Sequence, residues 1–198
     1  EYFKKEILNG INGILFYDYI CYFVRCGLMD CRVETDYAYL DFKNDQVRLC
    51  LTKAGLILEL KIYLICLQLV SQRGGDCLTS VTIDWDGDED LASTMKYLYD
   101  SEDPDSTIDT TNEIDVLASC GLTPYFISCK NGKFNSEELY KLYSVGERFS
   151  GGYGKKIIVT TNSAYALGEA RNVILQRAAD MGISVIENVH QKTDDEIA

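Results

Sequence analysis

The chain has 198 residues, of which 46% are apolar, and a formal net charge of -12. This length and composition suit one sizeable domain with a buried core, or one domain with a small addition. They exclude a membrane span. The most apolar stretch, AGLILELKIYLICLQLV, is interrupted by Glu59, Lys61 and Gln68, and no uninterrupted run reaches the ~18 residues that a span needs.

The acidity is local. Residues 84 to 115 hold twelve Asp and Glu and one Lys, which leaves 19 acids against 18 Lys and Arg elsewhere, a net charge of -1. We expect a solvated acidic loop there, or alternatively a rim that attracts cations to a neighbouring site. Basic residues outside this segment remain candidates for nucleic-acid binding. The candidates are Lys133, Lys155 and Lys156.

The eight cysteines show neither a CxxC pair nor the spacing of a zinc finger. Most of them lie inside apolar runs, so we expect reduced, buried thiols in a cytoplasmic protein. The sequence opens at EYFKKEIL without a Met, which indicates a piece of a longer protein.

In chain order, residues 1–53 predict a small module of helices and a hairpin. ILFYDYICYFVRCG (14–27) is typical of an apolar helix, and YAYLDFKNDQVRLCL alternates on both sides of Asn44-Asp45, as a hairpin does. Such a winged-helix-like module can bind nucleic acid, link domains or form a dimer contact.

Residues 54–198 predict an α/β domain in which strands and helices are packed around a mixed sheet. We expect Ser136 to cap the helix NSEELYKLYSVGERF, Gly182 to end the following helix, and KKIIVTTN to be a buried parallel strand. The predicted helices are 53–70, 136–149 and 164–182, and the predicted strands are 77–84, 113–119, 124–130, 155–162 and 183–189.

Two charged residues lie on predicted apolar strands, where they would not stabilise a hydrophobic core. Asp115 follows the start of one predicted strand and Lys130 ends the next. If these strands form a hairpin, both side chains reach the same end of the sheet, and Glu113 shares a face with Asp115. Taken alone, Asp115 and Lys130 would make a structural ion pair.

A third charge points to a metal site. Glu59 lies in a helical stripe of Leu and Ile, where a buried carboxylate needs a partner or a cation. Converging carboxylates favour Mg²⁺ or Mn²⁺ over zinc. A lysine beside such an ion can orient the attacking water and stabilise the charge of a phosphorane.

This order of helix Glu, strand Asp and strand (D/E)xK resembles the PD-(D/E)xK nuclease superfamily. Within this superfamily, the sequence is similar to the nuclease region of CARF-domain nucleases, the cyclic-oligoadenylate-activated effectors of type III CRISPR defence. The likeness runs from about residue 53 to 187, and its segments agree in order and spacing. They are AGLILELKIY, TIDWDG, NEIDVL, FISCKNG, ELYKLYSVGERFSGGYGKKIIVTTN and ARNVILQRAADMGI.

The resemblance implies a restriction-endonuclease-like core at 54–198 and an endonuclease that cuts DNA or RNA with Mg²⁺ or Mn²⁺. It also implies a homodimer that a cyclic oligoadenylate activates through a CARF sensor, for which this sequence has no counterpart. By the same resemblance, Asp115 binds metal, Lys130 is catalytic, Glu59 is the helix Glu, and the carbonyl of Cys129 is a further metal ligand.

Ser128 departs from the pattern, which has Asp or Glu at this position. A hydroxyl is a weak, neutral ligand, so the site loses one negative charge. Glu113 or Asp84 could supply a second carboxylate and keep the site active. Alternatively, Ser128 marks a catalytically silent nuclease-fold module that binds nucleic acid or forms dimers. A restriction-type nuclease unrelated to CRISPR is the third interpretation.

Overall fold

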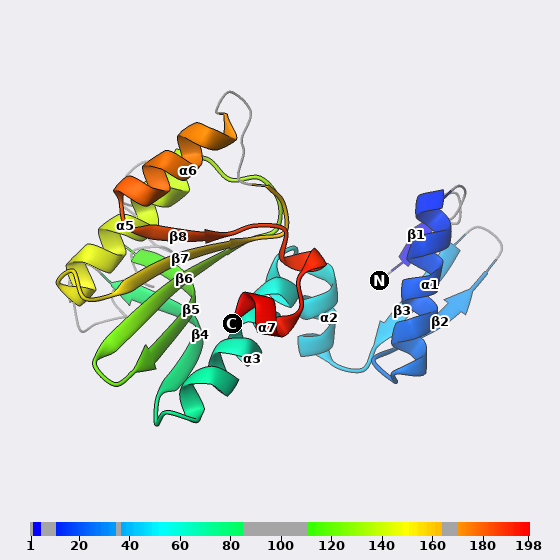
Figure 1. Ribbon diagram of the computed structural model, residues 1–198. Coiled ribbons are helices and arrows are strands. Elements are labelled where there is room, and N and C mark those ends of the chain that lie inside the picture. Colours follow the sequence, from blue (N-terminus) through cyan, green and yellow to red (C-terminus); the bar gives the residue numbers. More distant parts are fainter. Residues whose placement is uncertain (1, 5–10, 35–36, 85–110, 164–169) are drawn as a thin grey trace, which may run out of the picture. The chain divides into compact units, whose positions relative to one another are not determined.

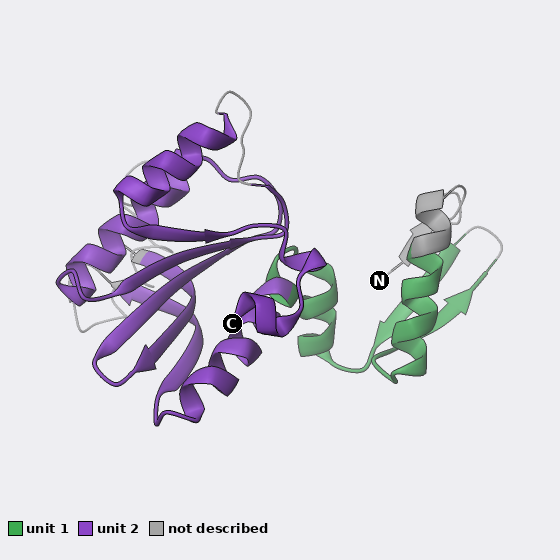
Figure 2. Ribbon diagram, in the orientation of Figure 1, with its two compact units in different colours: residues 1–57 green, residues 58–198 purple. Residues whose placement is uncertain are grey.

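The computed structural model describes residues 2–4, 11–34, 37–84, 111–163 and 170–198. Its contacts divide the chain into two compact units, Glu1–Ile57 and Leu58–Ala198 (Figure 2). Most of the predicted acidic loop and the start of the helix predicted over 164–182 lie outside the described residues. All eight cysteines are described, and each is a free thiol.

The first unit is a three-stranded antiparallel sheet with two helices. Its strands run in the order β1-β3-β2, and β2 and β3 form a hairpin. The elements are β1 (Tyr2–Lys4), α1 (Ile11–Arg25), β2 (Met29–Val33), β3 (Tyr37–Phe42) and α2 (Asp45–Thr52).

The N-terminal hairpin is confirmed, but its predicted position around Asn44-Asp45 is wrong. Strand β3 pairs with the preceding β2, and the segment after Asn44 is helix α2. The Asn44 side chain accepts a hydrogen bond from the Val47 N–H at 2.9 Å. Because this N-cap stabilises a helix directly after Asn44, it overrides the alternating pattern of the residues that follow.

The second unit is a five-stranded mixed sheet with helices on both faces (Figure 1). Strands β4, β5 and β6 are antiparallel neighbours, and β6, β7 and β8 are parallel neighbours. The predicted α/β class and mixed sheet are confirmed. The elements are α3 (Leu56–Ser71), β4 (Asp76–Asp84), β5 (Thr111–Cys120), β6 (Thr123–Lys130), α5 (Ser136–Ser150), β7 (Lys155–Thr160), α6 (Arg171–Asp180), β8 (Ile183–Ile186), η2 (Val189–Gln191) and α7 (Asp194–Ile197).

Each face of this sheet has its own core. Helices α3 and α7 contact one face, and α5 and α6 contact the other. Strand β7 contributes Val159 to the first core and Ile158 to the second, and both side chains are buried. Burial on both faces explains why this strand is continuously apolar after its two lysines.

The start of α5 differs by one residue from the sequence-based expectation. Asn135, not Ser136, is the N-cap: its side chain accepts the Glu138 N–H at 3.4 Å. Gly151 ends the helix in the left-handed region, at a φ of 57°, and its N–H donates to the Glu147 carbonyl. These two caps determine where α5 begins and ends, and they put Glu138 in its first turn.

No single helix in the described ranges is both long and apolar enough to cross a membrane; α2 and α3 meet those criteria only as a broken pair.

Candidate functional site

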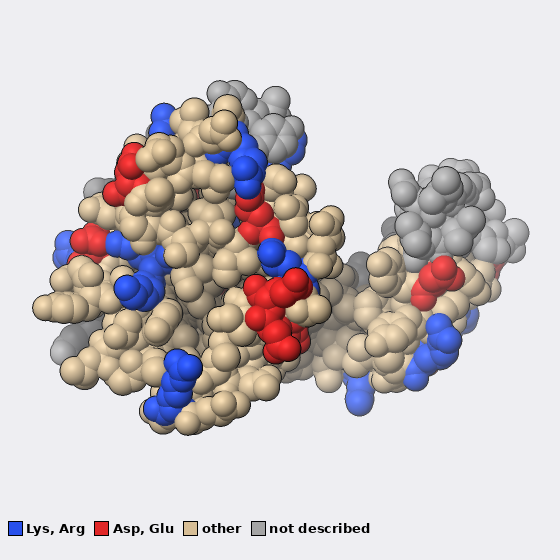
Figure 3. Space-filling view, viewed as in Figure 1, with Lys and Arg blue, Asp and Glu red and all other residues tan. Residues whose placement is uncertain are grey.

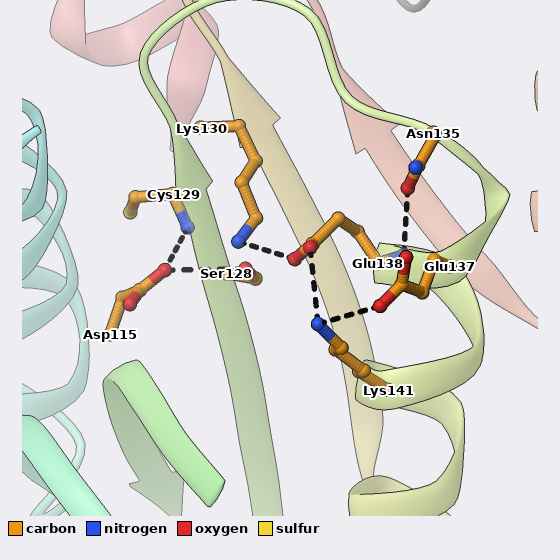
Figure 4. Close-up of polar contacts among 8 residues, drawn as sticks. All are labelled: Asp115, Ser128, Cys129, Lys130, Asn135, Glu137, Glu138 and Lys141. Carbon is orange, nitrogen blue, oxygen red and sulfur yellow. Dashed lines mark hydrogen bonds and ion pairs between the residues drawn. The ribbon is translucent and has the colours of Figure 1, made fainter. Parts of the chain in front are cut away.

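The candidate site lies where β5 and β6 separate. Their paired register begins at Cys120–Thr123 beside the turn and ends at Val116–Ile127. At the next position on β5, the link to β6 is made by the Asp115 side chain instead of the main chain. Its Oδ2 accepts the Cys129 N–H at 2.6 Å and the Ser128 hydroxyl at 3.2 Å (Figure 4). The predicted hairpin therefore brings Asp115 to the same end of the sheet as Lys130, which is the last residue of β6.

Strand geometry is irregular at this point. Ser80, which stands opposite Asp115 between the pairs Thr79–Val116 and Val81–Ile114, has a φ of 51°. This conformation is uncommon for a residue other than glycine. Val116 contacts the α3-side core whereas Ile114 contacts the α5-side core, although residues two apart in a regular strand share a face. The irregularity turns the start of β5 toward α5.

Burial dominates the electrostatics of Asp115. It raises the pKa of this carboxyl above its usual range, and the charge of Glu113 raises it further. The bonds from Cys129 and Ser128 and the charge of Lys130 lower it, but they do not cancel the effect of burial. Because a desolvated carboxylate gains more from a cation than an exposed one, Asp115 is suited to hold a positive ion.

Lys130 belongs to a charged network with the first turns of α5. Its Nζ contacts Glu138 Oε2 at 2.6 Å, and Lys141 Nζ lies 3.6 Å from Glu138 Oε1 and 3.0 Å from Glu137 Oε1 (Figure 4). Burial alone raises the pKa of Glu138, but the hydrogen bond and charge of Lys130, with help from Lys141, outweigh it and hold that pKa below its usual range. Glu138 is therefore a charged partner of Lys130.

These groups line one pocket of about 350 Å³ between β5, β6 and α5. Its charged lining residues are Glu113, Asp115, Lys130, Glu138 and Lys141, and Ser128 contributes a hydroxyl. Carboxylates and ammonium groups thus face the same solvent-filled space. Such a pocket can hold a cation and an anion at once.

The oxygen donors at Asp115 fit a hard divalent cation. A strand residue projects its N–H and C=O to the same side, so the Cys129 carbonyl points to the same side as the N–H that Asp115 accepts. Asp115, this carbonyl, the Ser128 hydroxyl and Glu113 offer oxygen atoms only. No group of three His, Cys, Asp or Glu in the described part of the chain forms a ready ligand set. Mg²⁺ commonly takes one or two carboxylates and keeps several waters, so this donor set suits it.

The Cys129 thiol belongs to the opposite face. It is buried in the α3-side core, and burial, reinforced by the charges of Asp115 and Glu59, raises its pKa far above the ordinary value. The thiol therefore stays protonated and is no metal ligand; only the main chain of Cys129 serves the site. Glu59 is half-buried on α3, close enough to act on Cys129, but it does not line the pocket. The side chain of Asp84 lies outside those that the structure describes.

The three lysines predicted to bind nucleic acid lie in different surroundings. Lys133 is exposed and follows β6 directly, at the Lys130 end of the sheet. Lys155 is exposed beside Tyr125, about 16 Å along β6 from Lys130 at ~3.3 Å per residue. Lys156, its neighbour, is only 6% exposed and forms an ion pair with Glu147. Of these three lysines, only Lys133 lies at the end of the sheet where Asp115 and Lys130 meet.

The place of Glu138 and Lys141 beside Lys130 was not predicted from the sequence. A local signal existed, because Asn135 followed by Glu138 is the spacing of an N-cap and its N3 acid. This signal predicts a helix start and gives no contact with Lys130. That contact depends on where α5 crosses the sheet.

Charge on the visible face of the second unit is mixed. Figure 3 shows basic and acidic side chains interspersed over a mostly uncharged surface, with an acidic patch where α7 lies. The acidic residues of α7 are Asp194, Asp195 and Glu196. On this face, the described residues form no continuous basic surface of the kind that binds long stretches of duplex.

No protein-family model matches the chain, and no curated protein matches it. Solved structures that are similar to it include those of three proteins. Protein VC1899 from Vibrio cholerae has a TM-score of 0.64 at 16% identity, over 94% of this chain and 41% of that one. Can2 from Sulfobacillus thermosulfidooxidans, solved in complex with cyclic tetra-adenylate, has a TM-score of 0.47 at 20% identity, over 73% and 33%. AF1548, a protein of unknown function, has a TM-score of 0.38 at 18% identity, over 68% and 60%.

The chain spans less than half the length of VC1899 and of Can2. At such low identity the likeness concerns the fold and no activity. Over most of its length, the chain shares the fold of protein VC1899 from Vibrio cholerae.

Proposed function

We propose that the second unit is a divalent-metal-dependent nuclease that hydrolyses phosphodiester bonds in DNA or RNA. The observation that carries the proposal is the end of the β5–β6 hairpin. There a partly buried carboxylate, which accepts the Cys129 N–H, lines one pocket together with a hydroxyl and a lysine. The resemblance of the sequence to PD-(D/E)xK nucleases supports the same assignment for Asp115 and Lys130.

In this proposal Asp115 is the principal ligand of a Mg²⁺ or Mn²⁺ ion, with the Cys129 carbonyl beside it and Glu113 as the second carboxylate. An ion held there would supply Lewis-acid chemistry: it would offset phosphate charge and make a water molecule more acidic. The Cys129 N–H and the Ser128 hydroxyl hold the Asp115 carboxylate in one orientation. Lys130 orients the attacking water and stabilises the negative charge that develops on phosphorus. Lys133, at the same end of the sheet, is placed to contact a neighbouring phosphate.

A cleavage assay tests this proposal. The chain is incubated with supercoiled DNA, single-stranded DNA or RNA, in Mn²⁺, Mg²⁺ or EDTA. We expect cutting that EDTA abolishes and that Asp115→Asn lowers about 10³-fold, the scale for removal of one transition-state electrostatic contact. Asp76→Asn is the matched control, because Asp76 also accepts a backbone N–H, from Cys77 at 2.8 Å, but pairs with Ser119 at the start of β4, away from Asp115. Cleavage in EDTA, or equal rates for both variants, contradicts the proposal.

Ser128 favours a second candidate, a catalytically silent nuclease-fold module that binds nucleic acid or forms dimers. Its side chain is neutral where a metal site of this kind usually has a carboxylate. Such a module binds nucleic acid equally well with and without Mn²⁺, and Asp115→Asn leaves that binding unchanged. Calorimetric titration of Mn²⁺ separates the two candidates, because the nuclease binds the ion through Asp115 and the silent module does not.

The sequence resemblance also supports a finer proposal: the effector part of a homodimeric, CRISPR-associated defence protein. A cyclic oligoadenylate would act on it only through a sensor outside this chain. Sedimentation equilibrium of the chain tests the dimer. The gene region upstream of Glu1 tests the sensor, because a CARF domain encoded there excludes an unrelated restriction-type enzyme.

A further inference from the structure

We propose that Glu138 on α5 is the positioning residue for Lys130: its carboxylate, and no side chain at position 128, holds the ammonium in place. The inference rests on the proposed nuclease function, because that function gives Lys130 its role. It adds a third element, α5, to a site otherwise built from β5 and β6.

The contact between the two side chains is short and sheltered. Lys130 Nζ and Glu138 Oε2 are 2.6 Å apart, and the two side chains are 28% and 27% exposed. The backbone of Glu138 is held in the first turn of α5, because its N–H donates to the side chain of the N-cap Asn135 (Figure 4). A long lysine side chain loses much rotamer freedom when it is fixed. Glu138 fixes it before the substrate arrives.

Ser128 does not make this contact. Its hydroxyl donates to Asp115 Oδ2 at 3.2 Å, so it supports the metal-binding carboxylate. In a (D/E)xK strand the acidic residue lies two positions before the lysine, on the same face. Here the carboxylate that contacts Lys130 comes from α5. One of three ammonium N–H groups meets Glu138, which leaves two for water and phosphate.

The neighbouring glutamate provides a matched control. Glu137 lies in the same helical turn and pairs with Lys141 at 3.0 Å, whereas Glu138 pairs with Lys130. The variants Glu138→Gln and Glu137→Gln therefore remove the same charge from the same turn of α5. Only the first removes the partner of Lys130.

The experiment compares Glu138→Gln, Glu137→Gln and the double variant Glu138→Gln/Ser128→Glu with wild type and Lys130→Ala. The readouts are kcat and KM for cleavage, Mn²⁺ affinity by calorimetry, and thermal unfolding. We expect Glu138→Gln to lower kcat about 10²-fold, the scale of a misplaced catalytic group, with KM and Mn²⁺ affinity unchanged. Glu137→Gln should keep wild-type kcat. Ser128→Glu should restore about tenfold of the loss, because it returns a carboxylate to the lysine.

Three results overturn the inference, and they differ from one another. Equal kcat for Glu138→Gln and Glu137→Gln, with Lys130→Ala inactive, removes the role of Glu138 and leaves the nuclease function intact. Loss of Mn²⁺ affinity in Glu138→Gln makes that residue a metal ligand instead of a positioning residue. A wild-type chain that neither cuts nor binds Mn²⁺ removes the nuclease function and this inference together.

Discussion

Two lysine–glutamate pairs join the central sheet to α5, one near each end of that helix. Lys130, at the end of β6, contacts Glu138 in the first turn, and both side chains are about a quarter exposed. Lys156, near the start of β7, contacts Glu147 near the last turn. Its side chain is only 7% exposed, and its ammonium lies 4.8 Å from the centre of the Tyr143 ring.

The difference between the pairs is what surrounds them. The Lys130 pair lines the pocket that also holds Asp115. In the other pair the lysine is buried and Glu147 is 39% exposed: a Cβ atom at Gly146 would lie 2.6 Å from the Lys156 stem, so no side chain fits between helix and strand there. The same chemistry therefore serves a proposed reaction at one end of α5 and packing at the other. An ion pair between helix and sheet indicates a site only where a pocket and a second functional group adjoin it.

The largest expected effect is on cleavage. Lys130→Met should lower kcat about 10³-fold, because it removes the cation that stabilises the transition state. Lys156→Met should leave kcat unchanged, since Lys156 pairs with Phe126, about 13 Å along β6 from Lys130 at ~3.3 Å per residue. Steady-state cleavage rates in Mn²⁺ check this prediction. Equal losses in both variants would mean that the two pairs do not differ in function.

The second effect is on stability and has the opposite pattern. Glu147→Gln leaves the buried Lys156 ammonium without its partner, which should lower the free energy of unfolding by about 2 kcal/mol, less than the ~3 kcal/mol of a fully buried pair because Glu147 is 39% exposed. Glu138→Gln should cost less than about 1 kcal/mol, because Lys130 reaches the water in its pocket. Urea unfolding measures both. A larger loss for Glu138→Gln would assign the structural role to the pocket pair.

From the sequence, Lys130 of the first pair was predicted as a site residue, but its partner was not, and the second pair was not predicted at all. The convergence of Asp115 and Lys130 follows from strand periodicity and a short hairpin turn, which are local properties. The partners Glu138 and Glu147 depend on how α5 crosses the sheet, and a local pattern does not contain that information. Lys155 and Lys156 were grouped as surface residues, although neighbouring strand positions face opposite ways and only one of the two is exposed.

The hairpin predicted around Asn44 failed for a related reason. Alternating residues after Asn44 fit a strand, but the N-cap bond from Val47 starts a helix there. Where periodicity and capping chemistry disagree over a short segment, the cap settled the outcome in this chain. The long elements from α3 to β8 had no such conflict, and their order was predicted correctly.

A third effect links the α5 cap to the pocket. Asn135→Ala removes the side chain that holds the first turn, which should lower the free energy of unfolding by about 1 kcal/mol. It should also reduce kcat several-fold, because the Glu138 backbone loses its anchor. The control is Asn44→Ala, which removes the same kind of cap from α2 and should cost similar stability without changing kcat. A similar fall in kcat for both variants would separate the cap from the pocket.

The smallest effect concerns the charge of Asp115. Its influence on stability as a function of pH has the opposite sign to that of a carboxylate whose pKa is lowered by folding. Burial raises the pKa of this carboxyl, so the folded state holds the proton more tightly than the unfolded state does. The stability that this provides is complete below the unfolded pKa of about 3.9 and is lost as the pH rises through the higher folded value. Asp115→Asn keeps an acceptor for the Cys129 N–H and carries no charge, so it should unfold at a higher temperature than wild type at pH 7. Near pH 3 the difference in unfolding temperature should vanish.

Mn²⁺ should remove the difference in unfolding temperature at pH 7 by stabilising wild type alone, because the ion binds only the charged site. Thermal unfolding from pH 3 to pH 8, with and without Mn²⁺, gives both comparisons. A variant less stable than wild type at pH 7 without metal would show that the bonds from Cys129 and Ser128 outweigh the burial of the charge, and that Asp115 holds the strands together as the buried Lys156 pair holds α5.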